Sequence, residues 1–119
     1  MGTQWKELPA PRAATPAERA VLRALARRAG VEPLAAQAAT ARVTALCACG
    51  CASVRLACEG PAIPRETVKA LSDGGRGDHC AVQVRAGAVD VVAHVVHGML
   101  VELELFAGEG VKVEIPNIG

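Results

Sequence analysis

The spacing of apolar residues changes near residue 40, and this change constrains the fold more than any other feature. Before it, apolar residues recur every three to four positions, as on one side of a helix: Val21, Leu22, Leu25, Ala26 and Ala29. After it, apolar and polar residues alternate, which is typical of strands with one buried face. The order predicts an α+β domain with N-terminal helices packed on a mainly antiparallel β-sheet of five to six strands.

The first helix carries its own start and stop signals. The segment Thr15-Pro16-Ala17-Glu18 matches the capping box, in which the Thr15 hydroxyl accepts from the Glu18 amide and Glu18 reaches back. Proline suits the first helical position, and Gly30 is a natural end. A shorter helix is expected from Pro33 to about residue 40.

The segment before this helix has no periodicity. Residues 1–14 hold Pro9 and Pro11 among alanines, so we expect a flexible leader there. A chain of 119 residues has room for one hydrophobic core. We therefore expect a single α+β domain over residues 15–119.

Glycines and prolines divide the second half of the chain into short elements. A helix is expected over residues 65–72, and strands are expected at residues 42–48, 52–58, 79–85, 89–96, 99–106 and 111–115. A two-residue loop at Cys49-Gly50 would pair Val43 with Leu56 and Ala45 with Val54.

The length of the loop at Ala86-Gly87-Ala88 decides which face of each later strand is buried. A three-residue loop aligns Cys80, Val82 and Val84 with Val92 and Val96 in one continuous apolar face, whereas a two-residue loop would separate them. We therefore expect the three-residue loop. The strand over residues 89–95 then faces outward with Val89, Val91, Ala93 and Val95, which predicts a homodimer unless a helix covers them.

The densest chemical feature is the C-x-C-x-C motif of Cys47, Cys49 and Cys51. Thiolates are good ligands for soft metals, and zinc or copper would suit them. The spacing differs from paired C-x-x-C motifs. In a regular hairpin the three side chains would point in different directions, so they converge only if the tip of the hairpin is irregular. Further donors could complete a site if the fold brings them close: Cys58, His79 and Cys80. The alternative is that cysteine serves here as a small buried hydrophobe.

The expected register also pairs Cys80 with His94 on the inner face. A thiol beside an imidazole is the minimal activated nucleophile, because histidine takes the proton. Asp90 shares that face but would lie roughly 13 Å from His94, too far to orient the ring. The weak catalytic candidates are therefore Cys80, His94 and Asp90, and the alternative is a histidine that only packs.

Composition limits the partners. Two aromatic residues are too few to stack single-stranded bases, and a formal net charge of +1 marks no polyanion-binding surface. No segment has the layout of a signal peptide or approaches the ~18 apolar residues of a membrane span. Five cysteines cannot all pair within one chain. We expect a cytoplasmic protein with reduced thiols, no nucleic-acid partner and no membrane partner.

Two stretches of the sequence are similar to those of a known group of proteins: residues 41–56, with the Cys47-Ala48-Cys49-Gly50-Cys51 motif, and residues 94–106. The chain resembles a group of small uncharacterised bacterial α+β proteins with a helical N-terminus, a C-x-C-G-C hairpin and a closing hairpin. The similarity covers about residues 15–115. It implies the fold and the cysteine hairpin, and it implies no activity and no catalytic residue.

Three functions stay open at this point. The first is a small binding or accessory protein with a small-molecule or protein partner. The second is a soft-metal or thiol-redox site at the cysteine hairpin. The third is a cone-shaped isomerase- or cyclase-like enzyme that uses His94. No complete catalytic signature occurs, so the sequence leaves open whether the protein is an enzyme.

Overall fold

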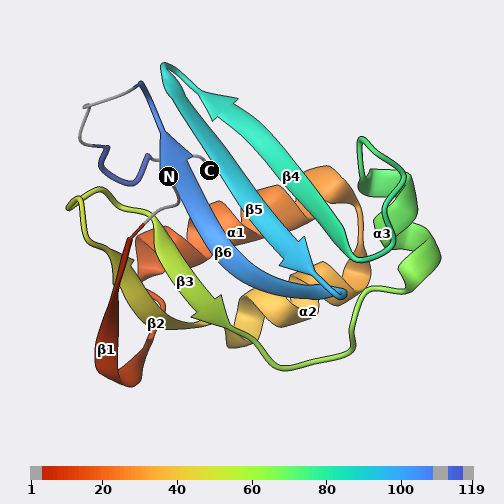
Figure 1. Ribbon diagram of the computed structural model, residues 1–119, viewed down its shortest axis with the longest axis horizontal. Coiled ribbons are helices and arrows are strands. Elements are labelled where there is room, and N and C mark those ends of the chain that lie inside the picture. Colours follow the sequence, from red (N-terminus) through yellow and green to blue (C-terminus); the bar gives the residue numbers. More distant parts are fainter. Residues whose placement is uncertain (1–3, 109–112, 117–119) are drawn as a thin grey trace.

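The structure is a computed structural model that describes residues 4–108 and 113–116. Its described part has the predicted α+β architecture, with three helices and one antiparallel sheet of six strands in the order β1-β2-β3-β6-β5-β4 (Figure 1). The helices are α1 (Pro16–Ala29), α2 (Glu32–Thr40) and α3 (Arg65–Leu71). The strands are β1 (Trp5–Ala13), β2 (Arg42–Cys47), β3 (Val54–Ala57), β4 (His79–Ala86), β5 (Val89–Val96) and β6 (Met99–Phe106).

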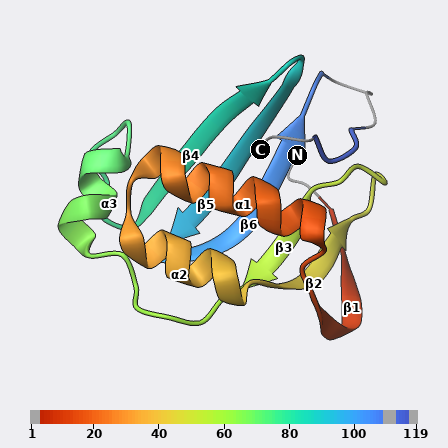
Figure 2. The same cartoon turned by 180° about the vertical axis from the view of Figure 1, so that it is seen from behind.

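Two helices cover one face of the sheet. Helices α1 and α2 lie side by side behind the strands in Figure 1, and the reverse view in Figure 2 shows them in front. Helix α3 lies beside β4, at one edge. No described helix covers the opposite face, which we call the open face. No helix in the described part of the chain is long and apolar enough to cross a membrane.

The predicted capping of α1 is confirmed. The Thr15 hydroxyl accepts a hydrogen bond from the Glu18 amide at 3.1 Å, and the Glu18 carboxylate accepts one from the Thr15 amide at 2.8 Å. Gly30 ends the helix with a φ of 68°, a left-handed conformation that glycine adopts without strain. The apolar stripe of this helix is buried, as expected: Val21, Leu22, Leu25 and Ala26.

The expected leader is wrong for Trp5–Ala13, because this segment is strand β1 and pairs antiparallel with β2. The register shifts between Glu7 and Arg12, so the prolines fall in an irregular part of an edge strand, where a missing N–H is tolerated. Arg12 also forms an ion pair with Glu18 at 2.9 Å, which links the strand to α1. The strand therefore belongs to the fold.

The hairpin of β2 and β3 has a longer connection than predicted. Val43 pairs with Leu56 as expected, but a register shift follows, and Ala45 pairs with Arg55 in place of Val54. The connection covers residues 48–53 in place of the predicted Cys49-Gly50 loop. We call these six residues the cysteine loop.

The register of β4 and β5 is the main correction. Ala86 pairs with Val89, so the turn has two residues, and Gly87 supplies a φ of 63° that suits a tight hairpin. One residue fewer in the loop reverses the faces of the strand. Val91 and Val95 are therefore fully buried beneath the helices, and the expected homodimer surface on residues 89–95 lies in the core.

Strand β6 continues this meander and contains one more irregularity. The register shifts where His94 pairs with Glu102 and Val95 pairs with Leu100. Leu100, not Val101, is therefore buried. The strand expected at 111–115 lies outside the described residues at 111–112, and residues 113–116 form no strand.

One polar side chain lies in the centre of the core. Gln37 of α2 is fully buried, and its amide nitrogen donates hydrogen bonds to the carbonyl groups of Pro61 and Gly98, both at 2.9 Å. Its amide oxygen accepts from the Leu100 amide at 2.7 Å. A buried amide with all these partners stabilises the packing of α2 against the turn between β5 and β6.

Candidate functional site

The cysteine loop brings together the three residues of the C-x-C-x-C motif. Cys47 ends β2, and Cys49 and Cys51 follow in the loop. The three sulfur atoms all lie within 4.8 Å of one another, and the Cys47 and Cys49 sulfurs share a hydrogen bond at 2.8 Å. The divergence expected of a regular hairpin does not occur, because six residues of irregular loop replace a two-residue turn.

Local backbone bonds explain how this loop turns. The Gly50 amide donates to the Cys47 carbonyl at 3.1 Å, which closes a four-residue turn. Gly50 has a φ of 88°, which a side chain would disfavour. The Cys51 amide then donates to the Cys49 sulfur at 3.3 Å. Because small residues alternate with the cysteines, the chain can turn tightly enough to bring the cysteine sulfur atoms close together.

Long-range hydrogen bonds hold the cysteine loop on the sheet. Ser53 is buried, its hydroxyl accepts from the Leu105 amide at 2.9 Å, and it donates to the Leu105 carbonyl at 3.3 Å. The Ala52 amide donates to the Val113 carbonyl at 2.8 Å. Sequence reasoning missed Ser53, because a lone serine near a strand end carries no signal of a partner 52 residues away.

The three thiols differ in their affinity for protons. Burial raises the pKa of Cys47 to about 12, and its hydrogen bond to Cys49 adds to the rise. The exposed Cys49 has the opposite shift, because the hydrogen bond from the Cys47 thiol and contacts with Cys51 lower its pKa to about 7. Near neutral pH Cys49 is therefore partly ionised, roughly half as thiolate, beside a protonated thiol at Cys47.

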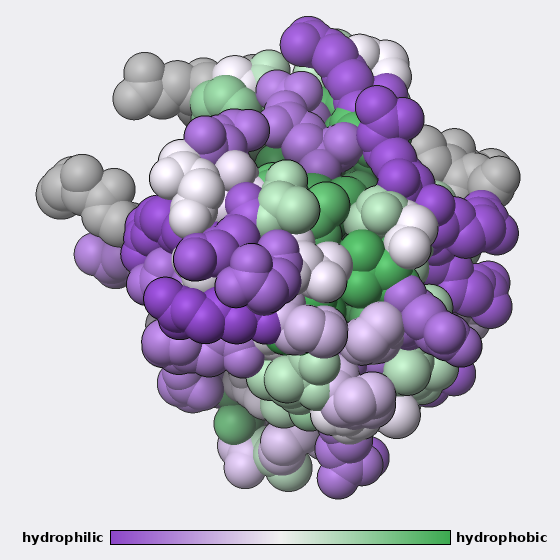
Figure 3. All heavy atoms as spheres, turned by 90° about the vertical axis from the view of Figure 1, so that its right-hand side faces the viewer, coloured by the Kyte–Doolittle hydropathy of each residue, from purple (hydrophilic) through white to green (hydrophobic). Residues whose placement is uncertain are grey.

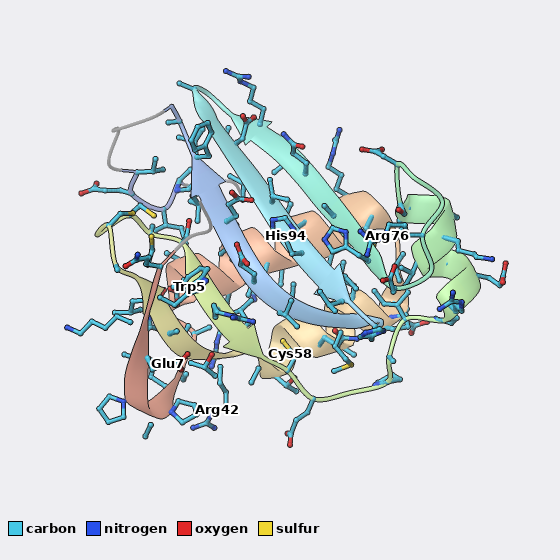
Figure 4. All side chains as sticks on the ribbon, in the orientation of Figure 1. Trp5, Glu7, Arg42, Cys58, Arg76 and His94 are labelled. Carbon is cyan, nitrogen blue, oxygen red and sulfur yellow. The ribbon has the colours of Figure 1, made fainter. Side chains whose placement is uncertain are left out.

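The further donors considered in the sequence do not join this cluster. Cys58 lies just beyond the far end of β3 from the cysteine loop (Figure 4), and burial raises its pKa to about 11. Cys80 is buried in the core on β4, where burial also raises its pKa. His79 lies on β4 as well and belongs to a different group of side chains.

The predicted Cys80–His94 pair is wrong. Cys80 pairs with Val95 on the core face, whereas His94 pairs with Ala81 and points to the open face. The two-residue turn at Gly87 separates them by reversing β5. Asp90 lies next to Arg85, with 3.8 Å between carboxylate and guanidinium, so it serves no nucleophile on β4.

His94 instead belongs to a polar group on the open face. Its Nε2 lies 2.7 Å from a carboxylate oxygen of Glu104, and its ring stacks on that of His79 with 5.7 Å between centroids. Glu102 is also close. Figure 4 places His94 near the middle of the sheet, away from the cysteine loop.

A shallow cavity of about 180 Å³ lies between the end of α3 and β4. Leu71, Arg76 and His79 contribute to its lining. Figure 3 shows apolar surface framed by polar side chains on this side of the molecule. The Arg76 guanidinium is held by two hydrogen bonds to Asp78, at 2.9 and 2.8 Å, so its charge is already paired. The charge of Arg76 in this cavity is therefore already neutralised by Asp78.

The chain matches no protein-family model, no curated protein and no solved structure.

Proposed function

We propose that this chain is a small cytoplasmic accessory protein that binds a soft metal ion through Cys47, Cys49 and Cys51. The observation that carries the proposal is that three sulfur atoms from five consecutive residues lie within 4.8 Å of one another. Metal–sulfur bonds of about 2.3 Å place tetrahedral sulfur ligands roughly 3.8 Å apart. Small side-chain rotations in the loop would give that spacing.

The protonation of the site supports metal capture. Cys49 has a pKa of about 7, so it offers a thiolate as first ligand at neutral pH. Once an ion is bound, its charge favours release of the protons from the other two thiols. Cys47, whose thiol is buried, would lose its proton only in that second step.

The ligand set favours cuprous copper or zinc. Thiolates select soft and borderline ions, and three of them suit a three-coordinate cuprous ion directly. Zinc would need a fourth ligand, and in the described part of the chain no other histidine, cysteine or carboxylate joins the group. An incomplete shell at an exposed loop also suits exchange of the ion with another molecule. A reducing compartment, such as the cytoplasm, would keep the thiols available.

Cobalt(II) provides the test, because its absorption bands distinguish sulfur ligands from oxygen and nitrogen. We expect a thiolate-to-cobalt band that saturates at one equivalent in the wild type and in a Cys58→Ser control. The band should be lost when Cys47, Cys49 and Cys51 are all replaced by serine. Under reducing conditions, equal bands in the control and in the triple variant would refute the proposal. If neither shows a band, uptake of cuprous copper decides, and equal uptake by the control and the triple variant would refute it.

A second candidate is a dithiol redox centre, which the 2.8 Å contact between the Cys47 and Cys49 sulfurs favours. In that reaction the Cys49 thiolate attacks a disulfide of an acceptor, and the Cys47 thiol, as it loses its proton, displaces the acceptor. Two protein thiols become one disulfide, and the acceptor disulfide becomes two thiols. Titration with glutathione disulfide and mass mapping of a Cys47–Cys49 bond would test it, and bound metal should slow its formation.

A further inference from the structure

The open face holds a second group of potential ligands, distinct in chemistry from the cysteine loop. His94 projects from β5, and Glu102 and Glu104 project from the neighbouring strand β6. The strand register places His94 directly opposite Glu102. Glu104, two residues further along, lies on the same face. Three side chains from two paired strands therefore meet on the open face of the sheet.

Their ligand atoms are close enough to share one ion. The His94 ring nitrogen and one oxygen from each carboxylate all lie within 4.8 Å of one another. The shortest separation is 2.7 Å, between His94 Nε2 and Glu104. Bonds of about 2.0–2.2 Å to nitrogen and oxygen would need these atoms a little over 3 Å apart. A small opening of the His94–Glu104 contact would create that space.

The negative charges of the Glu102 and Glu104 carboxylates favour the binding of a cation. Burial raises the pKa of Glu102, and the neighbouring Glu104 carboxylate also raises it. The nearby His94 and Arg55 lower it but do not outweigh burial. Glu102 forms no ion pair among residues 4–108 and 113–116, whereas Glu104 is engaged by His94. Two carboxylates on adjacent same-face positions, one of them half-buried, repel each other unless positive charge lies between them.

A neighbouring ring restricts the orientation of His94. His79 of β4 stacks on it with an angle of 28° between the ring planes. The stack restrains the plane of the imidazole, and the contact with Glu104 directs its Nε2 at the carboxylates.

We propose that His94, Glu102 and Glu104 form a binding site for a borderline divalent cation, for which zinc is the best fit. Imidazole nitrogen suits zinc, and carboxylate oxygens neutralise its charge, whereas neither carboxylate suits cuprous copper. The site leaves at least one coordination position to solvent. It does not depend on the cysteine loop, because the two groups share no residue.

The test removes the cysteine loop as a competitor. In protein with Cys47, Cys49 and Cys51 replaced by serine, zinc titration followed by calorimetry should give one site per chain. Adding His94→Ala should weaken zinc binding by about tenfold or more. His97→Asn is the matched control, because His97 lies in the β5–β6 turn with a φ of 51°, which asparagine tolerates. It should leave the affinity unchanged.

Nitrogen-15 spectra of the imidazole groups give a second readout that loss of folding cannot imitate. Zinc should shift the ring-nitrogen resonances of His94 and leave those of His97 in place. If the triple-serine protein binds zinc no better than its His94→Ala derivative, the proposal is wrong. It is equally wrong if zinc shifts His97 and not His94. Neither result bears on metal binding by the three cysteines.

Discussion

Ser53 replaces a backbone partner for Leu105, because its hydroxyl both accepts from the Leu105 amide and donates to the Leu105 carbonyl. The bond lies at the junction of β3, β6 and the cysteine loop. This buried hydroxyl, together with the bond from the Ala52 amide to the Val113 carbonyl, anchors the loop that carries the thiols.

Replacement of Ser53 by alanine should destabilise the fold. The variant leaves a buried amide and carbonyl without a partner, so the free energy of unfolding should fall by about 1–3 kcal/mol in urea titrations. Ser72→Ala is the control, because Ser72 accepts only an exposed bond from the Arg76 amide at 3.2 Å, and it should cost less than about 0.5 kcal/mol. Equal losses in both variants would show that the Ser53 bonds contribute little.

Alkylation of the reduced, metal-free protein should reveal an ordered set of thiols. Cys49 is exposed and should react first, at a rate that rises with pH to a midpoint of about 7. Below that midpoint the thiolate fraction, and with it the rate, falls about tenfold for each pH unit. Cys58, with its pKa of about 11, and the buried Cys80 should react slowly until the protein unfolds. Peptide mass spectrometry after timed quenching measures each site.

A variant separates the cause of the Cys49 shift from its exposure. Cys47→Ala removes the thiol that donates to the Cys49 sulfur, so the midpoint should move up toward 9.0. A midpoint that stays near 7 in this variant would mean that Cys47 does not stabilise the thiolate.

The ion pair between Arg12 and Glu18 should make stability fall in acid. Burial alone would raise the pKa of Glu18, but hydrogen bonds from Arg12 and Thr15 outweigh it and hold the pKa below its usual value. A lowered folded-state pKa stabilises the protein near neutral pH, and this contribution is lost as the pH falls through that pKa. Glu18→Gln should therefore cost a few tenths to about 1 kcal/mol near pH 7, and much less once the pH has fallen through the lowered pKa of Glu18.

Denaturant unfolding of both proteins across this pH range measures the effect. The control is Glu66→Gln, in the exposed first turn of α3, which should retain the acid-dependent loss of the wild type. A Glu18→Gln protein that loses stability in acid as steeply as the wild type would exclude this ion pair as the source.

Two glycines with similar backbone angles should tolerate alanine differently. Gly87 has a φ of 63° and nothing within 4 Å of an added Cβ, so Gly87→Ala should cost about 1 kcal/mol for its conformation alone. Gly98 has a φ of 80°, and a Cβ would lie 2.6 Å from the Ile63 carbonyl oxygen. Gly98→Ala should cost at least twice as much, since the backbone must also shift. Similar thermal midpoints for the two variants would contradict the close approach of Ile63.

Elements specified by neighbouring residues could be predicted from the sequence. The Thr15–Glu18 cap and the Gly30 stop define α1 within a few residues, and the structure has both. The strand over Trp5–Ala13 could not be predicted in this way, because its partner is β2, which follows it in the sequence only after helices α1 and α2. Its prolines are also evidence against a strand when that irregular edge is not known.

The geometry of the candidate sites depends on single residues in the loops, which the sequence pattern does not specify. The C-x-C-x-C motif named three thiols whose sulfur atoms the structure places within 4.8 Å of one another, but their convergence required a loop whose path depends on Gly50 and Ser53. In β5, one residue more or less at Gly87 decides whether His94 meets Cys80 or Glu104. The apolar pattern fits both registers, so the sequence alone could not choose between them.

The strand order has a consequence for how the molecule assembles. Strands β4, β5 and β6 form from consecutive segments, as do β2 and β3, whereas β3 and β6 meet only across a long stretch of chain, through Val54–Leu103 and Arg55–Glu102. Pairings between distant segments form slowly, because the intervening chain must first be ordered. The Ser53–Leu105 bonds cross this same seam. Bonds within the cysteine loop bring the three thiols together locally, but the Ser53–Leu105 bonds can anchor that loop only after the two halves of the sheet have joined.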